Sequence, residues 1–500
     1  MLAALFLLLL VIPHAAEAQG AGAPMSVWAH DALTRALSAC DDIADPFHRA
    51  QALAEIAEAQ VAAGEAKAAR DTLAQALAIA QRIDEEPLRN WATHDIALAY
   101  VKVDDLDAAE AAGETLRDVR LHDAVLAAVV DARRGERDIQ GALNTARRMK
   151  DVARQGFSLR TIAIQQAVGN DFAGAIATAR SIQYGRANAL ALGDVAAAIA
   201  RDGGFAQARS LAARIWDGSS RSRAFVEVAV AQAGIGDIHG ALATLAQVSD
   251  ALERAEGTAR VAAIRASSAP VAAREMFAQA LGAVGKARAG ASRRGDILIE
   301  IARAQLAAGE VSEAAATLKR AFGEIPRIKA DRERLNLLSR IAPLQARAGD
   351  FAGAFSTAMR AEDASLRPLL VRDIAAAQAE TGDVSGAIAM ARGLDDRAAT
   401  AAALFGILRV QSQAHDEPGL RQTIAATLEA VRVIGSAELR AGALGSLAAA
   451  HVREGDVEGA QAVFAEAMNT AAAADTGSQR AAVYARIADS LADRHRPLND

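Results

Sequence analysis

The sequence contains few aromatic residues and few prolines. Aromatic residues make up 4% of the 500 residues, although hydrophobic residues reach 52% and much of that share is alanine. Alanine is the best helix former and adds little side-chain bulk, so closely packed helices are favoured and a large aromatic core is excluded. Only 10 prolines are present, which also fits a mainly helical chain because proline breaks a helix interior.

Cysteine and excess positive charge are also scarce. Cys40 is the single cysteine, which excludes an intramolecular disulfide. No histidine-paired motif surrounds it, so a free buried thiol is favoured over a catalytic nucleophile. The net charge of −6 and the pI of about 5.9 provide no basic surface for nucleic acid, so we expect no nucleic-acid partner.

One apolar run, residues 2–12, lies at the N-terminus. Its eleven residues are too few to span a bilayer, which needs about 20. Pro13 and the pattern Ala16-Glu17-Ala18 follow, as at a signal-peptide cleavage site, although no Lys or Arg precedes the run. We therefore predict a signal peptide over 1–18 and an exported bacterial protein. It would be periplasmic or secreted, without membrane insertion after cleavage.

A glycine-containing turn recurs along most of the chain. The stretch AQAETGDVSGAIAMA at 377–391 has near-copies at 304–318 and 344–358. If the glycine of each turn is taken as a mark, successive marks are 33 or 40 residues apart and no other interval occurs. Such regularity predicts a solenoid of stacked repeats. The marks are Gly64, Asp104, Arg137, Asn170, Gly203, Gly236, Ala269, Gly309, Gly349, Gly382, His415 and Gly455.

The two intervals differ by seven residues, which is close to two α-helical turns. Seven added residues rotate the apolar face of a helix by only about 20°, so the helix lengthens without losing its packing stripe. We expect longer second helices, or longer connections after them, following Gly64, Ala269, Gly309, His415 and Gly455.

Each repeat has the pattern of two helices around one tight turn. An aliphatic residue stands eight positions before all 12 marks, and Asp or Glu follows ten of them. The acid is suited to capping a second helix, because it accepts backbone N–H bonds and faces the positive end of the helix dipole. Alanine stands five positions after ten marks, where a small residue lets two helices approach closely.

This unit resembles the tetratricopeptide repeat, a helix–turn–helix of 34 residues. The resemblance covers roughly residues 30–495 and rests on the small residue of the first helix, the Gly-acid turn and the alanine that opens the second helix. Examples are Ala375, Gly382-Asp383 and Ala387. The early Trp and closing Pro of that family are mostly absent, so the array is a divergent one. The resemblance implies a surface that binds protein segments.

We therefore predict an all-α superhelical solenoid of about 12 helix–turn–helix repeats over residues 28–495. A disordered segment, 19–27, would precede it and a tail, 496–500, would follow it. The ends are half-units, because 28–46 aligns with a second helix and 480–494 with a first helix that forms the closing cap. Residues 251–292 deviate most from the pattern and are either a hinge or a drifted repeat.

Two polar ladders recur beside the packing positions, and each has two interpretations. An arginine stands 15 residues before most marks, at the start of the first helix. It would bond the free carbonyls of the preceding second helix, or form a cationic row for an anionic partner. The candidate partner-contacting residues are Arg221, Arg254, Arg294, Arg334 and Arg367. A glutamine four residues before the mark would bond neighbouring repeats or a bound peptide backbone.

No catalytic residue, metal site or cofactor site is predicted. The sequence has no HExxH, CxxC, GxSxG or EF-hand motif, and its histidines fall at unrelated repeat positions. We expect a non-enzymatic scaffold that binds protein segments. The alternative is a carbohydrate- or small-ligand-binding accessory protein of the cell envelope, although Trp28, Trp91 and Trp216 are widely scattered in the sequence.

Overall fold

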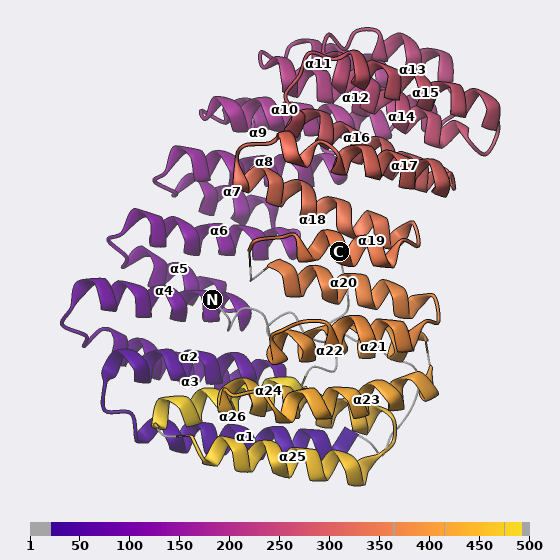
Figure 1. The fold of residues 1–500 in the computed structure, drawn as a ribbon. Coiled ribbons are helices and arrows are strands. Elements are labelled where there is room, and N and C mark those ends of the chain that lie inside the picture. The colour runs from indigo at the N-terminus through magenta and orange to yellow at the C-terminus, as the bar shows by residue number, and fades with distance from the viewer. Residues whose placement is uncertain (1–21, 364–365, 415, 475, 493–500) are drawn as a thin grey trace. The chain divides into compact units, whose positions relative to one another are not determined.

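A computed structural model describes residues 22–363, 366–414, 416–474 and 476–492 (Figure 1). Over these residues the chain forms 26 α-helices and one short 3₁₀ helix, and no strand. The predicted all-α solenoid of helix–turn–helix repeats is confirmed. The signal peptide and the tail 496–500 lie outside the described residues. Helix α1 begins at Gly22, so residues 22–27 are helical where we expected disorder.

Even-numbered helices are the first helices of the repeats, and odd-numbered helices are the second. The first helices are α2 (Pro46–Ala62), α4 (Glu86–Lys102), α6 (Val119–Gly135), α8 (Val152–Val168), α10 (Gly185–Arg201), α12 (Gly218–Gly234), α14 (Ala251–Arg265), α16 (Ala291–Ala307), α18 (Asp331–Arg347), α20 (Leu366–Glu380), α22 (Arg397–Ala414), α24 (Ala437–Arg453) and α26 (Gly477–Ala492). The second helices are α1 (Gly22–Asp41), α3 (Ala66–Ala80), α5 (Leu106–Glu114), α7 (Ile139–Arg147), α9 (Phe172–Ser181), α11 (Phe205–Ala213), α13 (Ile238–Leu245), α15 (Pro270–Lys286), α17 (Val311–Phe322), α19 (Phe351–Met359), α21 (Val384–Arg392), α23 (Glu417–Arg432) and α25 (Val457–Ala472).

The chain divides into two compact units. Unit 1 combines residues 1–129 with 364–500, and unit 2 is residues 130–363. Within each unit a first helix packs against its own second helix and against the first helices of adjacent repeats, as α12 does with α13, α10 and α14. The stretch 251–292, which we considered as a hinge, forms the hairpin of α14 and α15 inside unit 2.

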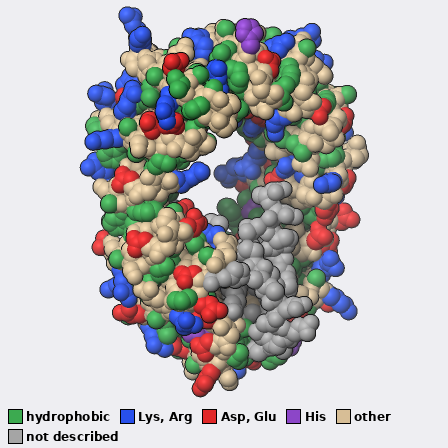
Figure 2. All heavy atoms as spheres, turned by 90° about the vertical axis from the view of Figure 1, so that its right-hand side faces the viewer, with side chains coloured by type: hydrophobic (Ala, Val, Ile, Leu, Met, Phe, Trp, Pro, Cys, Tyr) green, Lys and Arg blue, Asp and Glu red, His purple; other side chains and the backbone are tan. Residues whose placement is uncertain are grey.

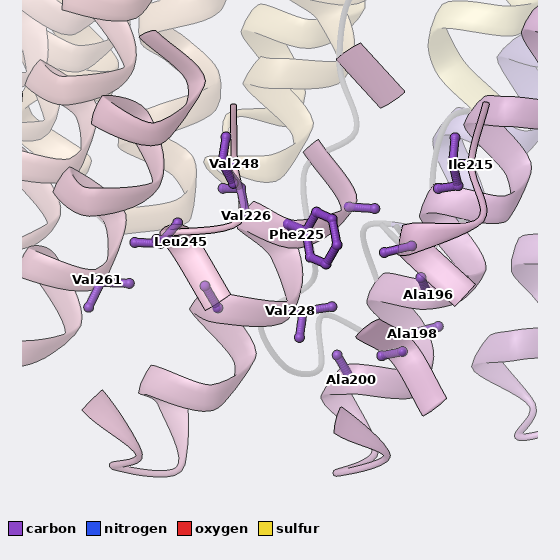
Figure 3. Packing of buried hydrophobic residues seen from close by; sticks show 14 of the residues in the cluster. Ala196, Ala198, Ala200, Ile215, Phe225, Val226, Val228, Leu245, Val248 and Val261 are labelled. Carbon is purple, nitrogen blue, oxygen red and sulfur yellow. The ribbon is translucent and has the colours of Figure 1, made fainter. Parts of the chain in front are cut away.

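Aliphatic and alanine positions form the core of every repeat. All 12 aliphatic residues placed eight positions before the marks are fully buried, and so are the ten alanines placed five positions after them. Figure 3 shows this packing in unit 2, where Phe225 and Val228 of α12 lie near Ala198 and Ala200 of α10. Burying one such aliphatic side chain contributes about 1.5–3 kcal/mol, so the repeated residue is a repeated source of stability.

Ten of the marks, all within the described residues, occupy the left-handed backbone region, as a helix-ending turn requires. Seven glycines there have φ between 76° and 91°, and Asp104, Arg137 and Asn170 have φ of 61–65°. Ala269 is different, with φ of −146°, and Pro270 follows it as the first residue of α15. Glycine takes positive φ without strain, whereas a side chain makes this conformation costly.

The extra seven residues of the 40-residue intervals lie in the second helices, as predicted. In the 33-residue intervals the second helix has 8–10 residues. In the four 40-residue intervals it has 15, 17, 12 and 16 residues, in α3, α15, α17 and α23, and α25, which follows the last mark, also has 16. Helix α17 is the shortest of these because a 3₁₀ turn, η2 (Ile325–Arg327), takes up part of the addition.

Gly236→Ala tests the turn. We expect it to lower the free energy of unfolding by about 1 kcal/mol, because alanine at φ 87° is strained. Gly236→Asn should cost less, since asparagine tolerates this conformation and Asn170 already occupies it. Gly234→Ala is the control, because Gly234 is helical and has no neighbouring atom within 4 Å. Urea unfolding measures all three, and equal stability of the two alanine variants would contradict the assignment.

Candidate functional site: the exposed face of the first helices in unit 2

The glutamine ladder belongs to the turn, and its bonds lie within one repeat. Gln232 donates to Asp237 Oδ2 at 3.2 Å and accepts a hydrogen bond from Thr244 Oγ1 at 2.6 Å. Gln166, Asp171 and Thr178 repeat this arrangement. Our expectation of bonds between neighbouring repeats is therefore wrong at these positions. The amide instead joins the first helix, the capping acid and the second helix of a single hairpin, which fixes the turn.

Two residues of this network were missed from the sequence. The threonine recurs eight positions after the mark, for example Thr178, Thr244 and Thr357, and is buried. A glycine recurs four positions after seven of the marks, where its backbone N–H donates to the capping acid, as Gly240 does to Asp237 Oδ1. At Gly240, an added Cβ would lie 2.0 Å from Asp237 Oδ2. Both columns were visible in the sequence as further residues repeating at the same interval.

The arginine ladder forms the bonds of its structural interpretation. Arg221 donates to the Ile215 carbonyl at 3.0 Å, and Arg254 donates to the Val248 carbonyl at 2.5 Å. Arg294 bonds the Ala289 carbonyl, and Arg334 reaches two carbonyls of the 328–329 segment at 3.2–3.3 Å. Arg367 lies in the first turn of α20, in unit 1.

Two of these arginines also pair with carboxylates. Arg294 Nη2 lies 2.6 Å from Glu324 Oε2, and this hydrogen bond lowers the pKa of Glu324 below its ordinary range. Arg334 Nη2 lies 2.6 Å from Asp331 Oδ1. The arginines stand on separate helices, each with acceptors of its own, so they do not form a single cluster of uncommitted cations.

A different column, which we also missed, lies on the exposed face of the first helices in unit 2. Nine positions before the mark, five successive repeats carry a charge: Asp194, Glu227, Arg260, Glu300 and Arg340. Their side chains are 22–31% exposed. Arg260 bridges α14 to α12 through two bonds to Glu227, at 2.6 and 3.0 Å. Arg340 similarly bridges α18 to Glu300 of α16 at 2.6 Å.

These bridges hold neighbouring first helices in register. A third one joins α8 to α10, where Arg160 Nε lies 2.6 Å from Asp194 Oδ2. A bidentate arginine–carboxylate pair adds geometric specificity as well as energy. The spacing of side chains along this face is therefore fixed by bonds within the protein.

Two carboxyl groups on this face have opposite pKa shifts. Burial raises the pKa of Glu256, and the nearby Glu300 carboxylate adds to the shift. Burial also opposes ionisation of Glu227, but hydrogen bonds to Arg260 and its charge outweigh this effect and lower the pKa of Glu227. Ionised Glu256 is therefore unfavourable for the fold, whereas ionised Glu227 is favourable.

A small hollow opens between α10 and α12. It is lined by Leu190, Gly193, Asp194, Ser220, Arg223, Ala224 and Glu227, and its volume is about 10 Å³. This is room for roughly one water-sized group. The hollow exists in part because Gly193 has no side chain, and its nearest neighbours would be 3.6 Å or more from an added Cβ. It can accept the tip of a side chain but cannot enclose a small-molecule substrate.

Three aromatic rings, of which Phe157 and Trp216 are exposed and Tyr184 is partly buried, lie at the start of the same helices. Phe157 of α8 and Tyr184, the N-cap of α10, are in edge-to-face contact with ring centroids 5.8 Å apart. Trp216, just before α12, is 65% exposed and approaches Gly185, the first residue of α10. An added Cβ at Gly185 would lie 3.4 Å from its ring. We call Phe157, Tyr184 and Trp216 the aromatic patch.

The described part of the chain contains no group of three or more His, Cys, Asp or Glu side chains that could hold a metal ion. His122 and Asp123 of α6 form a close pair, with Nδ1 and Oδ1 2.7 Å apart, but both side chains are fully buried and leave no surface for a substrate. Among the described helices, none combines the length and apolarity needed to cross a bilayer. On the face drawn in Figure 2, acidic and basic side chains are interspersed.

No protein-family model matches this sequence, and a search of curated proteins found no match. Solved structures align with it only distantly. Ton1535 from Thermococcus onnurineus NA1 is 15% identical over 68% of this chain and 97% of that chain, with a TM-score of 0.23. The APC/C hetero-tetramer Cut9-Hcn1 is 11% identical over 91% and 95%, with a TM-score of 0.27. The tetratricopeptide-repeat sensor protein PH0952 from Pyrococcus horikoshii is 9% identical over 79% and 71%, with a TM-score of 0.29. At these scores the fold assignment rests on the repeats of this chain itself.

Arg221→Gln and Arg254→Gln test the structural role of the arginine ladder. Each should lower the free energy of unfolding by about 1–2 kcal/mol, because a charge-assisted bond to a carbonyl is lost. Arg214→Gln is the control, since Arg214 is exposed. Thermal unfolding of the three variants is the measurement. If Arg221→Gln and Arg254→Gln have the same melting temperature as the parent protein, the carbonyl bonds contribute nothing to stability. The interpretation of the arginines as a cationic row for a partner would then gain support.

The two glutamates of the exposed face give a pH test with opposite signs. Glu256→Gln should raise stability at neutral pH, since a carboxyl whose pKa is raised on folding costs stability when ionised. The gain should vanish as pH falls below the ordinary glutamate pKa of about 4.3. Glu227→Gln should lower stability at neutral pH, and that loss should also shrink in acid. Urea unfolding at pH 7 and pH 4 distinguishes the two, and stability changes of the same sign would contradict opposite pKa shifts of Glu256 and Glu227.

Proposed function

We propose that this protein is an exported, non-enzymatic scaffold that binds an extended segment of another protein along the first helices of unit 2. The observation that carries the proposal is the row of partly exposed side chains on α8 to α18, held in register by ion pairs between neighbouring helices. A stack of helical repeats offers an extended surface of this kind, which suits an extended partner.

The aromatic patch is the proposed anchor of that segment. Aromatic side chains contribute a large share of binding energy at protein interfaces, most often near the centre of the contact. Trp216 and Phe157 are exposed although the chain has few aromatic residues. The hollow between α10 and α12 begins one helical turn after Trp216, at Ser220. It would receive a small polar group of the bound segment.

A carbohydrate ligand is the second candidate, and the position of Trp216 favours it. The indole lies against Gly185 and is otherwise 65% exposed, which is a suitable platform for stacking a sugar ring. One tryptophan beside two smaller rings offers one or two stacking positions. The row of charged side chains on α10 to α18, which runs from Asp194 to Arg340, is better matched to the varied side chains of a polypeptide.

Selection from a library of random linear peptides, with the mature chain as bait, tests the proposal. We expect enriched peptides whose binding falls at least tenfold in Trp216→Ala and in Phe157→Ala. Trp91→Ala is the matched control, because Trp91 is 51% exposed and occupies the position equivalent to Phe157 in unit 1. A glycan array is run in parallel. Binding to glycans with no enriched peptide would reverse the ranking of the two functions.

Export is part of the proposal and has its own test. The predicted cut after Ala18 would leave Gln19 as the mature N-terminus, three residues before α1 begins at Gly22. N-terminal sequencing of the protein from its native cell should give Gln19, in a periplasmic or culture-medium fraction. An intact Met1 in a cytosolic fraction would refute export without bearing on the binding surface.

A further inference from the structure

The two ends of the chain carry complementary halves of a repeat. Helix α26 has the pattern of a first helix, and α1 has the pattern of a second helix. Both belong to unit 1, and they pack side by side there (Figure 1). Helix α26 also packs against α24 and α2, the contacts that a first helix makes with its neighbours.

Polar and aromatic contacts join the two ends. Trp28 of α1 stacks on Phe464 of α25, with ring centroids 5.0 Å apart and planes inclined by 11°. Arg480 of α26 donates to the Ala474 carbonyl at 3.2 Å, which is the bond of the arginine ladder, and to Asp42 Oδ2 at 2.8 Å. The ladder bond therefore continues into the last helix, and the same guanidinium reaches the residue that follows α1.

Burial shows that α26 is an interior helix. Val483, Tyr484, Ala485, Ile487 and Ala488 are all 5% exposed or less, and they face several directions around the helix. A terminal cap of a repeat array needs a polar outer face. Our expectation that this helix is a closing cap is thus wrong, because α1 covers the side that a cap would leave to solvent. Ala29, Ala32, Leu33 and Ala36 form the buried side of α1.

The approach of the two ends leaves no room for a side chain at Gly477. A Cβ added there would lie 2.8 Å from the Ala39 carbonyl oxygen and 2.9 Å from the Asp42 Cβ. Both distances are shorter than normal contacts, so even alanine would push the end of α1 away from the start of α26. Glycine at this position is a requirement of the contact between the ends.

We propose that α26 and α1 form one composite repeat, and that this terminal seam is a conformational device that keeps the ends of the chain together and can open as a unit. The seam replaces the two polar caps of an open array with one apolar contact. When α1 leaves, the apolar side of α26 becomes available to other helices, including α1 of a second copy. Whether α1 packs on α26 of its own chain or leaves it therefore decides whether unit 1 is completed by one chain alone.

Cys40 provides a probe of seam opening because it is the only thiol of the chain. It lies next to Ala39 and is 2% exposed, and burial raises its pKa to about 12. Reaction with a thiol reagent at neutral pH requires the sulfur to become accessible, so the rate reports release of α1. With the full chain, Gly477→Ala should speed the reaction of Cys40 with an aromatic disulfide reagent at least tenfold. Gly435→Ala is the control, since Gly435 precedes α24 and has no atom within 4 Å.

Hydrogen exchange separates seam opening from general destabilisation. In Gly477→Ala we expect faster exchange in peptides from α1 and α26, and unchanged exchange in peptides from α10 and α12. A double-mutant cycle of Trp28→Ala and Phe464→Ala should show non-additive effects on the labelling rate of Cys40. An unchanged labelling rate in Gly477→Ala, or a uniform rise in exchange over the whole chain, would overturn the proposal.

Discussion

The close packing of each second helix against its first helix, through a fully buried alanine, is the constraint on which this structure depends. Ten alanines placed five residues after the marks have no exposed surface, and the aliphatic residues eight positions before the marks are equally buried. Larger side chains at such a position would overpack the contact at a cost of about 1–3 kcal/mol. The two exceptions, Arg274 and Leu420, both lie in second helices of the long type. A residue larger than alanine thus occurs at this position only where the second helix is long.

The residues that recur in most repeats are used to build the repeat itself. The capping acid, the glutamine, the threonine and the glycine at the start of the second helix form one hydrogen-bonded turn, as in Gln232, Asp237, Gly240 and Thr244. The arginines bond the carbonyls at the end of the preceding second helix. Positions that differ between repeats carry the chemistry of the exposed face. The column that holds Phe157 continues as Leu190, Arg223, Glu256, Asp296 and Asn336 in successive repeats. Repeat-to-repeat variation therefore coincides with the proposed binding surface, and regularity marks the scaffold.

The contact between the chain ends follows from the same geometry. A repeat array exposes an apolar face at each end, and burying both faces against one another removes that exposure without dedicated caps. Here the half-repeats at the two ends supply a first and a second helix, so their union preserves the pairing used everywhere else. Gly477 marks the place where the union is tightest. Unit 1 is consequently built from two segments distant in sequence, whereas unit 2 is built from one continuous segment.

The sequence alone determined the helical class, the interval of the repeats, the position of the turns and the location of the additional residues. These are local properties, set by residues a few positions apart, so a recurring pattern predicts them directly. The turn network was also within reach, since Thr244 and Gly240 recur as regularly as Gln232. The hydrogen-bond partners of the polar columns could not be predicted from the sequence. Gln232 bonds inside its own repeat, and Arg260 reaches the preceding first helix 33 residues away, because helix packing decides which side chains meet. The aromatic patch and the pairing of α1 with α26 were likewise decided by tertiary structure. They join residues that no periodic pattern relates, and only the stacking of the repeats brings them together.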